Sequence, residues 1–217
     1  MDEARLATRL RACYSGAVHD VLRSMGHREC VLPSDIQGLT FGMQTSGPVF
    51  TVSGHLDNSL DGHETLLRWT KFLSLAKPGA VVVCQPNTSA VALMGELSAE
   101  TLKGRGVLGY IVDGGCRDCS FIVRSSFPVF CRFRTPADVV GRWVPDSFET
   151  PVTIGAVTVG PTDYVVADAD GVVVIPGKVA HEVVDRTEEV MQTENKVRTA
   201  ILAGMDPHEA YLRFGKF

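Results

Sequence analysis

The spacing of hydrophobic and polar positions changes along the chain, and each change predicts a different kind of element. Near the start, apolar residues recur at helical spacing, and Val18, Val21 and Leu22 share one face. Ser15 is placed to cap this helix and Gly26 to end it. The pattern before residue 80 predicts a helical segment over 1–26 with its main helix at 17–25, a loop over 27–46, a strand over 48–53 and a helix over 64–76.

Between residues 80 and 131 short apolar runs alternate with longer amphipathic segments. The run 80–84 contains no charged residue, as expected of a strand that is buried on both faces. The expected elements are a strand over 80–84, a helix over 89–103, a strand over 107–112 that Asp113-Gly114-Gly115 breaks, a helix over 118–124 and a strand over 128–131. This order of strands and helices predicts a largely parallel sheet covered by helices.

The last third of the chain predicts two hairpins and a long helix. Apolar residues alternate on both sides of Gly155-Ala156 and again around 168–171, which is typical of β-hairpins. Helical spacing of apolar positions predicts a helix over 178–203. We therefore expect an α/β layered sandwich with a largely parallel central sheet, C-terminal β-hairpins and a long C-terminal helix. A single domain is expected over 1–217, with a helical extension over 178–217.

Composition narrows the class of protein. Of the 217 residues, 45% are hydrophobic and 21% charged, which excludes a largely disordered chain. A net charge of -4 argues against nucleic acid as a partner. No apolar run approaches the roughly 18–20 residues that span a bilayer, and the first residues lack the pattern of a signal peptide. The six cysteines have no secretory context, so we expect a cytoplasmic protein with reduced thiols and no membrane partner.

One segment, 95–118, carries most of the candidate chemistry; its sequence is GELSAETLKGRGVLGYIVDGGCRD. It starts where a loop enters a predicted helix and ends just after a buried strand. The entry turn consists of Gly95, Glu96, Leu97 and Ser98. Free backbone N–H groups in such a turn suit a carboxylate or an oxyanion. Loops at the carboxyl ends of parallel strands are also where α/β proteins place ligand sites.

Two charged residues, Arg117 and Asp118, end this segment. Arg117 provides a planar, permanently charged fork for a carboxylate or an enolate. Asp118 provides a hard oxygen ligand for a divalent ion such as Mg²⁺. Gly114 and Gly115 would let the chain turn tightly before them. An Arg-Asp pair after glycines is also a common helix cap with a surface ion pair, so spacing alone leaves a structural role and a ligand site both open.

Three further groups of polar residues each have a structural and a functional interpretation. Cys116 and Cys119 could be a redox pair or half of a zinc site, but no second pair lies at zinc spacing, which favours incidental thiols. A loop over 55–63 is rich in histidine and aspartate; we favour a solvated loop, with substrate gating as the alternative. Arg132 and Arg134 are interpreted as surface charge, with a second carboxylate site as the alternative.

The segment Gly95–Asp118 resembles the signature of the RraA-like family. That family includes the regulator of ribonuclease activity A and the class II 4-hydroxy-4-methyl-2-oxoglutarate and 4-carboxy-4-hydroxy-2-oxoadipate aldolases. The shared pattern is Gly-(Asp/Glu)-Leu-x-Ala, a helix, a glycine turn, a strand and Asp-Gly-x-x-Arg-Asp. Further segments that resemble the family are 19–22, 77–84, 153–159 and 166–172. The resemblance covers 15–185 and implies the family's swivelling β/β/α fold.

The resemblance also implies a role for each residue of the segment. Arg117 would bind the 2-oxo group of a substrate and stabilise the enolate, and Asp118 would hold Mg²⁺, Mn²⁺ or another divalent metal. Glu96 stands where the best-known aldolases carry aspartate, and it would position a water that shuttles the proton. The backbone that would face the pyruvyl part of the substrate is that of Gly95, Glu96, Leu97 and Ser98.

These roles imply a divalent-metal-dependent lyase that cleaves a C–C bond of a 4-hydroxy-2-oxo acid and releases pyruvate. Oxaloacetate decarboxylation would accompany it, because both reactions pass through a pyruvate enolate. The resemblance also implies a homotrimer or homohexamer. The alternative is a non-catalytic regulator that binds a ribonuclease or helicase; an intact Glu96, Arg117 and Asp118 favours the enzyme. Phe121 replaces an acid that aldolases often carry, and 55–68 differs from the usual version, which leaves the distal part of the substrate open.

Overall fold

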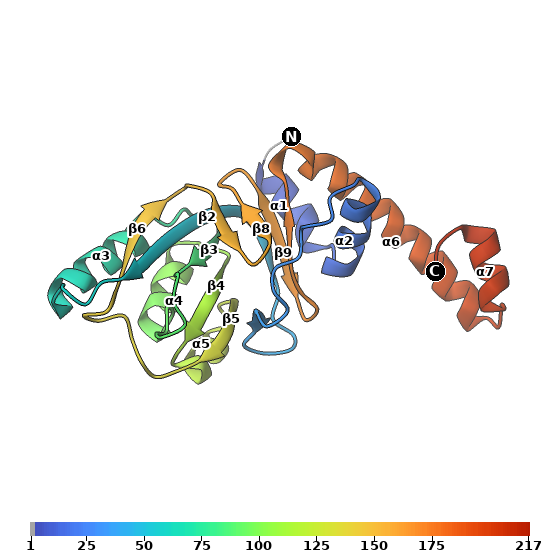
Figure 1. Cartoon of the computed structure of the whole chain (residues 1–217). Helices are drawn as coiled ribbons and strands as arrows, with labels where there is room; N and C mark the ends of the chain where they lie inside the picture. Colours follow the sequence, from blue (N-terminus) through green and yellow to red (C-terminus); the bar gives the residue numbers. More distant parts are fainter. Residues whose placement is uncertain (1–2) are drawn as a thin grey trace.

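A computed structural model describes residues 3–217 and places a mixed sheet at the centre of the chain (Figure 1). The strand order is β1-β5-β4-β3-β2-β9-β10, and β6 pairs with β2. Strands β2 to β5 run parallel, and antiparallel strands extend both edges. The strands are β1 (Gln37–Gly38), β2 (Thr45–Leu56), β3 (Val81–Gln85), β4 (Gly109–Cys116), β5 (Val129–Arg134), β6 (Trp143–Phe148), β7 (Val152–Ile154), β8 (Val157–Val159), β9 (Tyr164–Asp168) and β10 (Gly171–Ile175).

The parallel strands are covered on both faces, and alternation along each strand sends neighbouring side chains to different cores. Val82 and Cys84 of β3 pack toward helices, whereas Val81 and Val83 pack toward the hairpin formed by β7 and β8. Helices α3, α4 and α5 form the helical layer (Figure 1). The helices are α1 (Glu3–Arg11), α2 (Ser15–Ser24), α3 (Gly62–Leu75), α4 (Glu96–Gly104), α5 (Cys119–Ser125), α6 (Ala180–Leu202) and α7 (Pro207–Phe214), with a 3-10 turn η1 (Gly177–Val179).

A third layer packs on the hairpin of β9 and β10. Val172 and Val174 face the inner core, while Val173 and Ile175 face helices α1, α2 and α6. Figure 1 shows α6 running away from the sheet and carrying α7 at its far end. None of the described helices combines the length and the apolar composition that crossing a bilayer requires.

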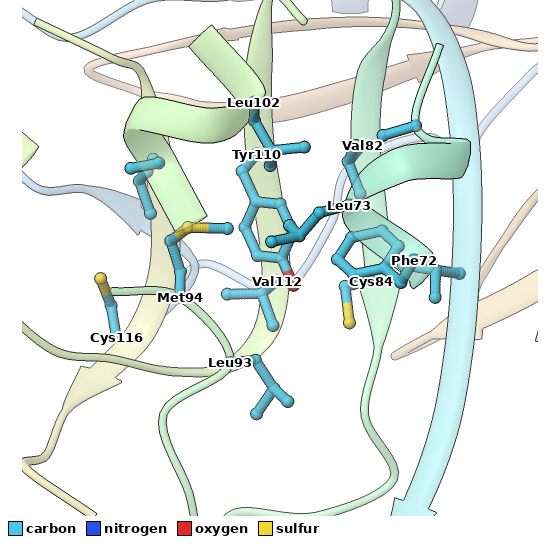
Figure 2. Close-up of a cluster of buried hydrophobic side chains, with 14 of the residues drawn as sticks. Phe72, Leu73, Val82, Cys84, Leu93, Met94, Leu102, Tyr110, Val112 and Cys116 are labelled. Carbon is cyan, nitrogen blue, oxygen red and sulfur yellow. The ribbon is translucent and has the colours of Figure 1, made fainter. Parts of the chain in front are cut away.

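Tyr110 anchors the helical layer to β4. Its ring is fully buried among Phe72, Leu102 and Met94, beside the Cys84 thiol (Figure 2). Burial raises the pKa of the Tyr110 hydroxyl well above its ordinary value, so the group stays neutral. Close packing of this kind holds α4 in a single position against β4, and the candidate site depends on that position.

The expected α/β class, the buried strands and both C-terminal hairpins are confirmed. Two boundaries beside the candidate site were wrong. The helix expected over 89–103 begins only at Glu96, because Ala92 pairs with Gly115 and Leu93 N–H donates to the Gly115 carbonyl at 2.8 Å. The break expected at 113–115 does not occur: β4 continues to Cys116, with a register shift after Val112.

The predicted cap of the second helix was also wrong. Ser15 is the first helical residue of α2, and Tyr14 before it makes no side-chain cap. Instead, the carboxylate of Asp168 accepts hydrogen bonds from the Ser15 backbone N–H at 2.7 Å and from its hydroxyl at 2.6 Å. A carboxylate that is distant in sequence therefore accepts a hydrogen bond from the first N–H of this helix, where the helix dipole favours negative charge. Part of the helical segment expected over 1–26 lies outside the described residues. The described part contains α1 and α2, which a short break over 12–14 separates.

Candidate active site

The N-terminus of α4 meets the C-terminal end of β4, which is a central strand of the sheet. The extended stretch before α4 lies along β4 and is held there by main-chain hydrogen bonds. Arg117 N–H donates to the Met94 carbonyl at 2.9 Å. Glu96 N–H then reaches Oδ2 of Asp118 at 3.1 Å, although the two residues are 22 apart in sequence. The two ends of the segment 95–118 are thus brought together.

Gly95 is required at this meeting point because of space rather than backbone conformation. Its φ of -144° is extended and open to any residue. A Cβ at this position, however, would lie 2.8 Å from Oδ2 of Asp118 and 3.2 Å from Nε of Arg117. Glycine therefore lets both charged side chains lie directly against the entry to α4.

Gly114 and Gly115 do not form the tight turn expected of them, because both lie within β4. Gly115 is instead needed for close approach. A Cβ there would lie 2.7 Å from the Phe133 ring and 2.8 Å from the Val91 carbonyl oxygen. The stretch before α4 can approach β4 only where such a side chain is missing.

Arg117 lies between two carboxylates. Its Nη1 is 3.1 Å from Oδ2 of Asp138, and its Nε is 3.5 Å from Oδ2 of Asp118. These two ion pairs give the guanidinium a defined orientation. All three side chains are about 40% exposed, so the guanidinium also remains open to a ligand. Sequence reasoning missed Asp138, which lies in a loop without a recognisable motif between β5 and β6.

Asp118 has an uncommon backbone conformation. Its φ of 54° and ψ of 28° are left-handed, and it precedes α5 without capping it through its side chain. Such a conformation costs a non-glycine residue about 1 kcal/mol, although aspartate tolerates it better than most. Oδ2 is engaged by Glu96 N–H, whereas Oδ1 has no hydrogen-bond partner among residues 3–217. One carboxylate oxygen is therefore available to a ligand.

The first turn of α4 supplies unpaired donors. Within the described residues, the N–H groups of Leu97 and Ser98 have no acceptor, and the Glu96 carboxylate has no partner. The Ser98 hydroxyl accepts a hydrogen bond from Nε1 of the buried Trp69 at 2.9 Å, which connects α3 to this turn. The turn can therefore receive an anion, and the positive end of the helix dipole favours one.

Oδ1 of Asp118 is the unengaged oxygen of the residue that the sequence named as a metal ligand. Within residues 3–217, no group of three or more histidine, cysteine, aspartate or glutamate side chains is placed to hold a metal ion. Mg²⁺ nevertheless binds often through one or two carboxylates while it keeps several waters. The half-exposed carboxylate of Asp118, with Oδ1 unengaged, fits such a water-rich site and does not fit a closed zinc site.

The other groups singled out in the sequence have structural partners. Arg132 pairs with Asp113 and with Asp35, and Arg134 donates to the Leu39 carbonyl. In the 55–63 loop, His55 pairs with Asp146, and Asp61 caps α3. Cys116 is buried and Cys119 half-buried, both as free thiols. These contacts support the structural interpretation of all three groups.

The fold is that of one class of proteins. A family model described as RraA-like, Aldolase/RraA, matches residues 15–174, so the chain belongs to this family. The resemblance seen in the sequence is thereby confirmed.

Relatives of the chain carry different names. It is 28% identical over 211 residues to a protein of Halalkalibacterium halodurans named "Putative 4-hydroxy-4-methyl-2-oxoglutarate aldolase", covering 97% of this chain and 95% of that one. The chain is also 28% identical to Protein DlpA of Legionella pneumophila. That match covers 94% of this chain but only 33% of the length of DlpA. A crystal structure of Streptomyces coelicolor RraAS2, described as an unusual member of the RNase ES inhibitor RraA protein family, has a TM-score of 0.78 and 28% identity. That match covers 89% of this chain and 96% of RraAS2.

Proposed function

We propose that the chain is a divalent-metal-dependent lyase that cleaves a C–C bond of a 4-hydroxy-2-oxo acid and releases pyruvate. Oxaloacetate decarboxylation is proposed as a companion activity through the same enolate. The observation that carries the proposal is the contact between the first turn of α4 and the end of β4. It places Glu96, Arg117 and Asp118 beside two unpaired N–H groups. The family, which includes proteins named as aldolases, supports it.

Arg117 binds the 2-oxo oxygen in this proposal. Negative charge develops on that oxygen as the C–C bond breaks, and a donor already held in place stabilises it without reorganisation. Asp138 and Asp118 hold the guanidinium from two sides, at 3.1 and 3.5 Å. We infer that Asp138 is a positioning residue for Arg117.

The substrate carboxylate is assigned to the first turn of α4. The N–H groups of Leu97 and Ser98 are unpaired within the described chain, and a carboxylate oxygen can accept from both. Because Trp69 donates to the Ser98 hydroxyl, the turn keeps its place when an anion binds. Binding there orients the 2-oxo group toward Arg117.

Glu96 and Asp118 supply the remaining chemistry. The Glu96 carboxylate has no partner within the described residues, so it is available to move a proton through a water to or from the substrate. Asp118 would hold Mg²⁺ or Mn²⁺, and such an ion, when bound, acts as a Lewis acid for the charge on the 2-oxo acid. No lysine is used: Lys103 lies at the far end of α4, about 10 Å along the helix axis from Glu96.

We also propose that the chain acts as a homotrimer or homohexamer. Leu97 is 78% exposed and Phe121 is 47% exposed, and both lie on the helices that carry the site. Because α4 and α5 contact each other, these two apolar side chains are available to a common interface. Light scattering that found only a 23.4 kDa monomer would contradict this part of the proposal.

Pyruvate release tests the function directly. Purified protein is incubated with 4-hydroxy-4-methyl-2-oxoglutarate or oxaloacetate, with Mg²⁺ or with EDTA, and pyruvate is measured by a coupled NADH assay. We expect Mg²⁺-dependent release that Asp118→Asn lowers by about 10²-fold or more. Asp170→Asn is the matched control because Asp170 is exposed in the β9–β10 turn. Release that is insensitive to EDTA, or equal in both variants, would contradict the proposal.

A regulator without catalysis is the second candidate. It is favoured by the likeness to RraAS2, whose family is described as an RNase ES inhibitor family. In that case immobilised wild-type protein and Asp118→Asn would capture a purified ribonuclease or helicase equally well. Such capture together with no pyruvate release from either substrate would reverse our preference.

A further inference from the structure

A pocket of about 360 Å³ lies at the opposite ends of the strands that carry the candidate site. Its wall includes Thr45 at the start of β2, Leu108 before β4 and Pro128 before β5. Arg117, in contrast, follows β4. Eight strand residues separate the two places, which corresponds to about 26 Å along the strand. A molecule in this pocket would therefore not occupy the candidate active site.

Two cations without carboxylate partners line this pocket. Within the described residues, Arg11 forms no ion pair, and Nζ of Lys103 donates only to the Ser125 carbonyl. The lining acid, Asp168, is already engaged: both its oxygens accept hydrogen bonds from Ser15, and one also accepts from Asp170 N–H. Burial raises the pKa of the lining Cys13 thiol to about 11, so it adds no charge at neutral pH. Two cations and one carboxylate therefore line the pocket, and the net charge of its wall is positive.

A buried hydroxyl in the same wall lacks a hydrogen bond. Ser46 is 2% exposed, and its Oγ has no partner within the described residues. Its neighbour Thr45 is satisfied, because Oγ1 donates to the Leu108 carbonyl at 3.0 Å. Buried polar groups in native proteins are almost always paired, with protein, water or a ligand. Ser46 therefore marks a place where a polar atom of a bound molecule would be stabilised.

Much of the remaining wall is apolar, and Gln44 and Ser126 add two polar side chains. Buried side chains come from Leu10 of α1, from Phe127 in the loop before β5 and from Val166 of β9. Pockets that bind small molecules are mostly apolar with a few well-placed polar groups, and their volumes start near 300 Å³. This pocket has that composition, and its size suits a molecule of about ten non-hydrogen atoms.

We propose that this pocket is a second ligand site, which binds a small organic carboxylate with an apolar body. Arg11 and Lys103 pair with the carboxylate, Ser46 donates a hydrogen bond to it, and Leu10, Phe127 and Val166 contact the apolar part. The site does not depend on the proposed lyase activity. Both helices that carry the candidate active site end here, since Lys103 lies in the last turn of α4 and Ser126 follows α5.

Calorimetric titration of the full-length protein tests this site with benzoate as the probe. Benzyl alcohol has a similar shape without the charge, and inorganic phosphate has charge without the apolar body. We expect benzoate to bind at least about tenfold more tightly than either. Failure of benzoate to bind, or equal binding of benzyl alcohol or phosphate, would overturn the proposal.

Variants locate the binding. The double variant Arg11→Gln/Lys103→Gln should weaken benzoate binding about tenfold or more, and Ser46→Ala should weaken it without lowering Tm. Lys71→Gln is the charge-matched control because Lys71 is exposed on α3 outside this pocket. Arg117→Gln should keep wild-type binding of benzoate, which separates this site from the candidate active site. Loss of binding in Arg117→Gln, or its retention in the double variant with an unchanged Tm, would refute the assignment.

Discussion

Replacing Gly95 by alanine tests whether close contact at the entry to α4 positions the charged groups. The added Cβ would lie 2.8 Å from Oδ2 of Asp118 and 3.2 Å from Nε of Arg117, whereas ordinary contacts begin at 3.4 Å. The Asp118 carboxylate must therefore move by about 0.6 Å. It can do so because it lies at the end of a half-exposed side chain.

The two consequences of this movement differ in size. The free energy of unfolding should change by less than about 1 kcal/mol. The side-chain shift costs about 0.5–1.5 kcal/mol, and the Gly→Ala change stabilises by about 0.4–1 kcal/mol because it lowers the conformational entropy of the unfolded chain. Catalysis should suffer more. A 1 Å misplacement can cost about 10²-fold in rate, so a shift of about half that size predicts a loss of about tenfold or more in kcat.

The assay compares pyruvate release and thermal unfolding of Gly95→Ala and Gly104→Ala. Gly104 lies at the other end of the same helix, and a Cβ there meets nothing within 4 Å. Gly104→Ala should keep the wild-type rate and unfold at the same or a higher temperature. If Gly95→Ala kept the full rate, or lost rate only together with a large fall in Tm, the argument from close contact would be refuted.

Three other predictions follow from packing and ionisation. Leu22→Ala should lower the free energy of unfolding, measured in urea, by about 2–5 kcal/mol, because Leu22 is fully buried. Leu202→Ala, at an 81% exposed position, should change this free energy by less than about 0.5 kcal/mol. A hydrogen bond from Lys216 lowers the pKa of Asp20, so this pair stabilises the fold above the ordinary aspartate pKa and loses its effect as pH falls through the lowered value. Lys216→Met should therefore lower Tm at pH 6 and have a smaller effect below about pH 4; an equal effect at both would contradict this. Burial raises the pKa of the Cys84 thiol to about 12, so iodoacetamide should label half-buried Cys119 well before Cys84, and equal rates by mass spectrometry would be inconsistent with the structure.

Periodicity predicted the elements whose signal is local. The buried strands β3 and β4 and the hairpins β7–β8 and β9–β10 were recognisable because their apolar alternation is complete within a few residues. β6 was missed because it contains Pro145 and pairs with β2 alone, as edge strands do. α7 lies within the helical extension expected over 178–217, but its separate start was not predicted. Asp206 followed by Pro207 is a usable signal for that start, because the Asp206 carboxylate accepts from two N–H groups of the first turn.

The residues of the candidate site could be predicted from the sequence, but most of their contacts could not. Glu96, Arg117 and Asp118 could be named from the chain alone, because their residue types and spacing match a family pattern that lies on one continuous segment. Their contact could not be read from that pattern. It depends on the stretch before α4 pairing with β4 and on the missing side chains of Gly95 and Gly115. Asp138 joins the site from a loop that carries no local signal.

Residue type and short-range spacing thus define which groups are available and which short elements form, because both are properties of neighbouring residues. Asp168 capping α2, Asp138 holding Arg117 and the pocket at Ser46 join segments that are far apart in the chain. Such pairings depend on how the layers pack, and packing is a property of the folded whole. Local sequence therefore named the candidate chemistry, and the arrangement of layers around the sheet determined its geometry and its partners.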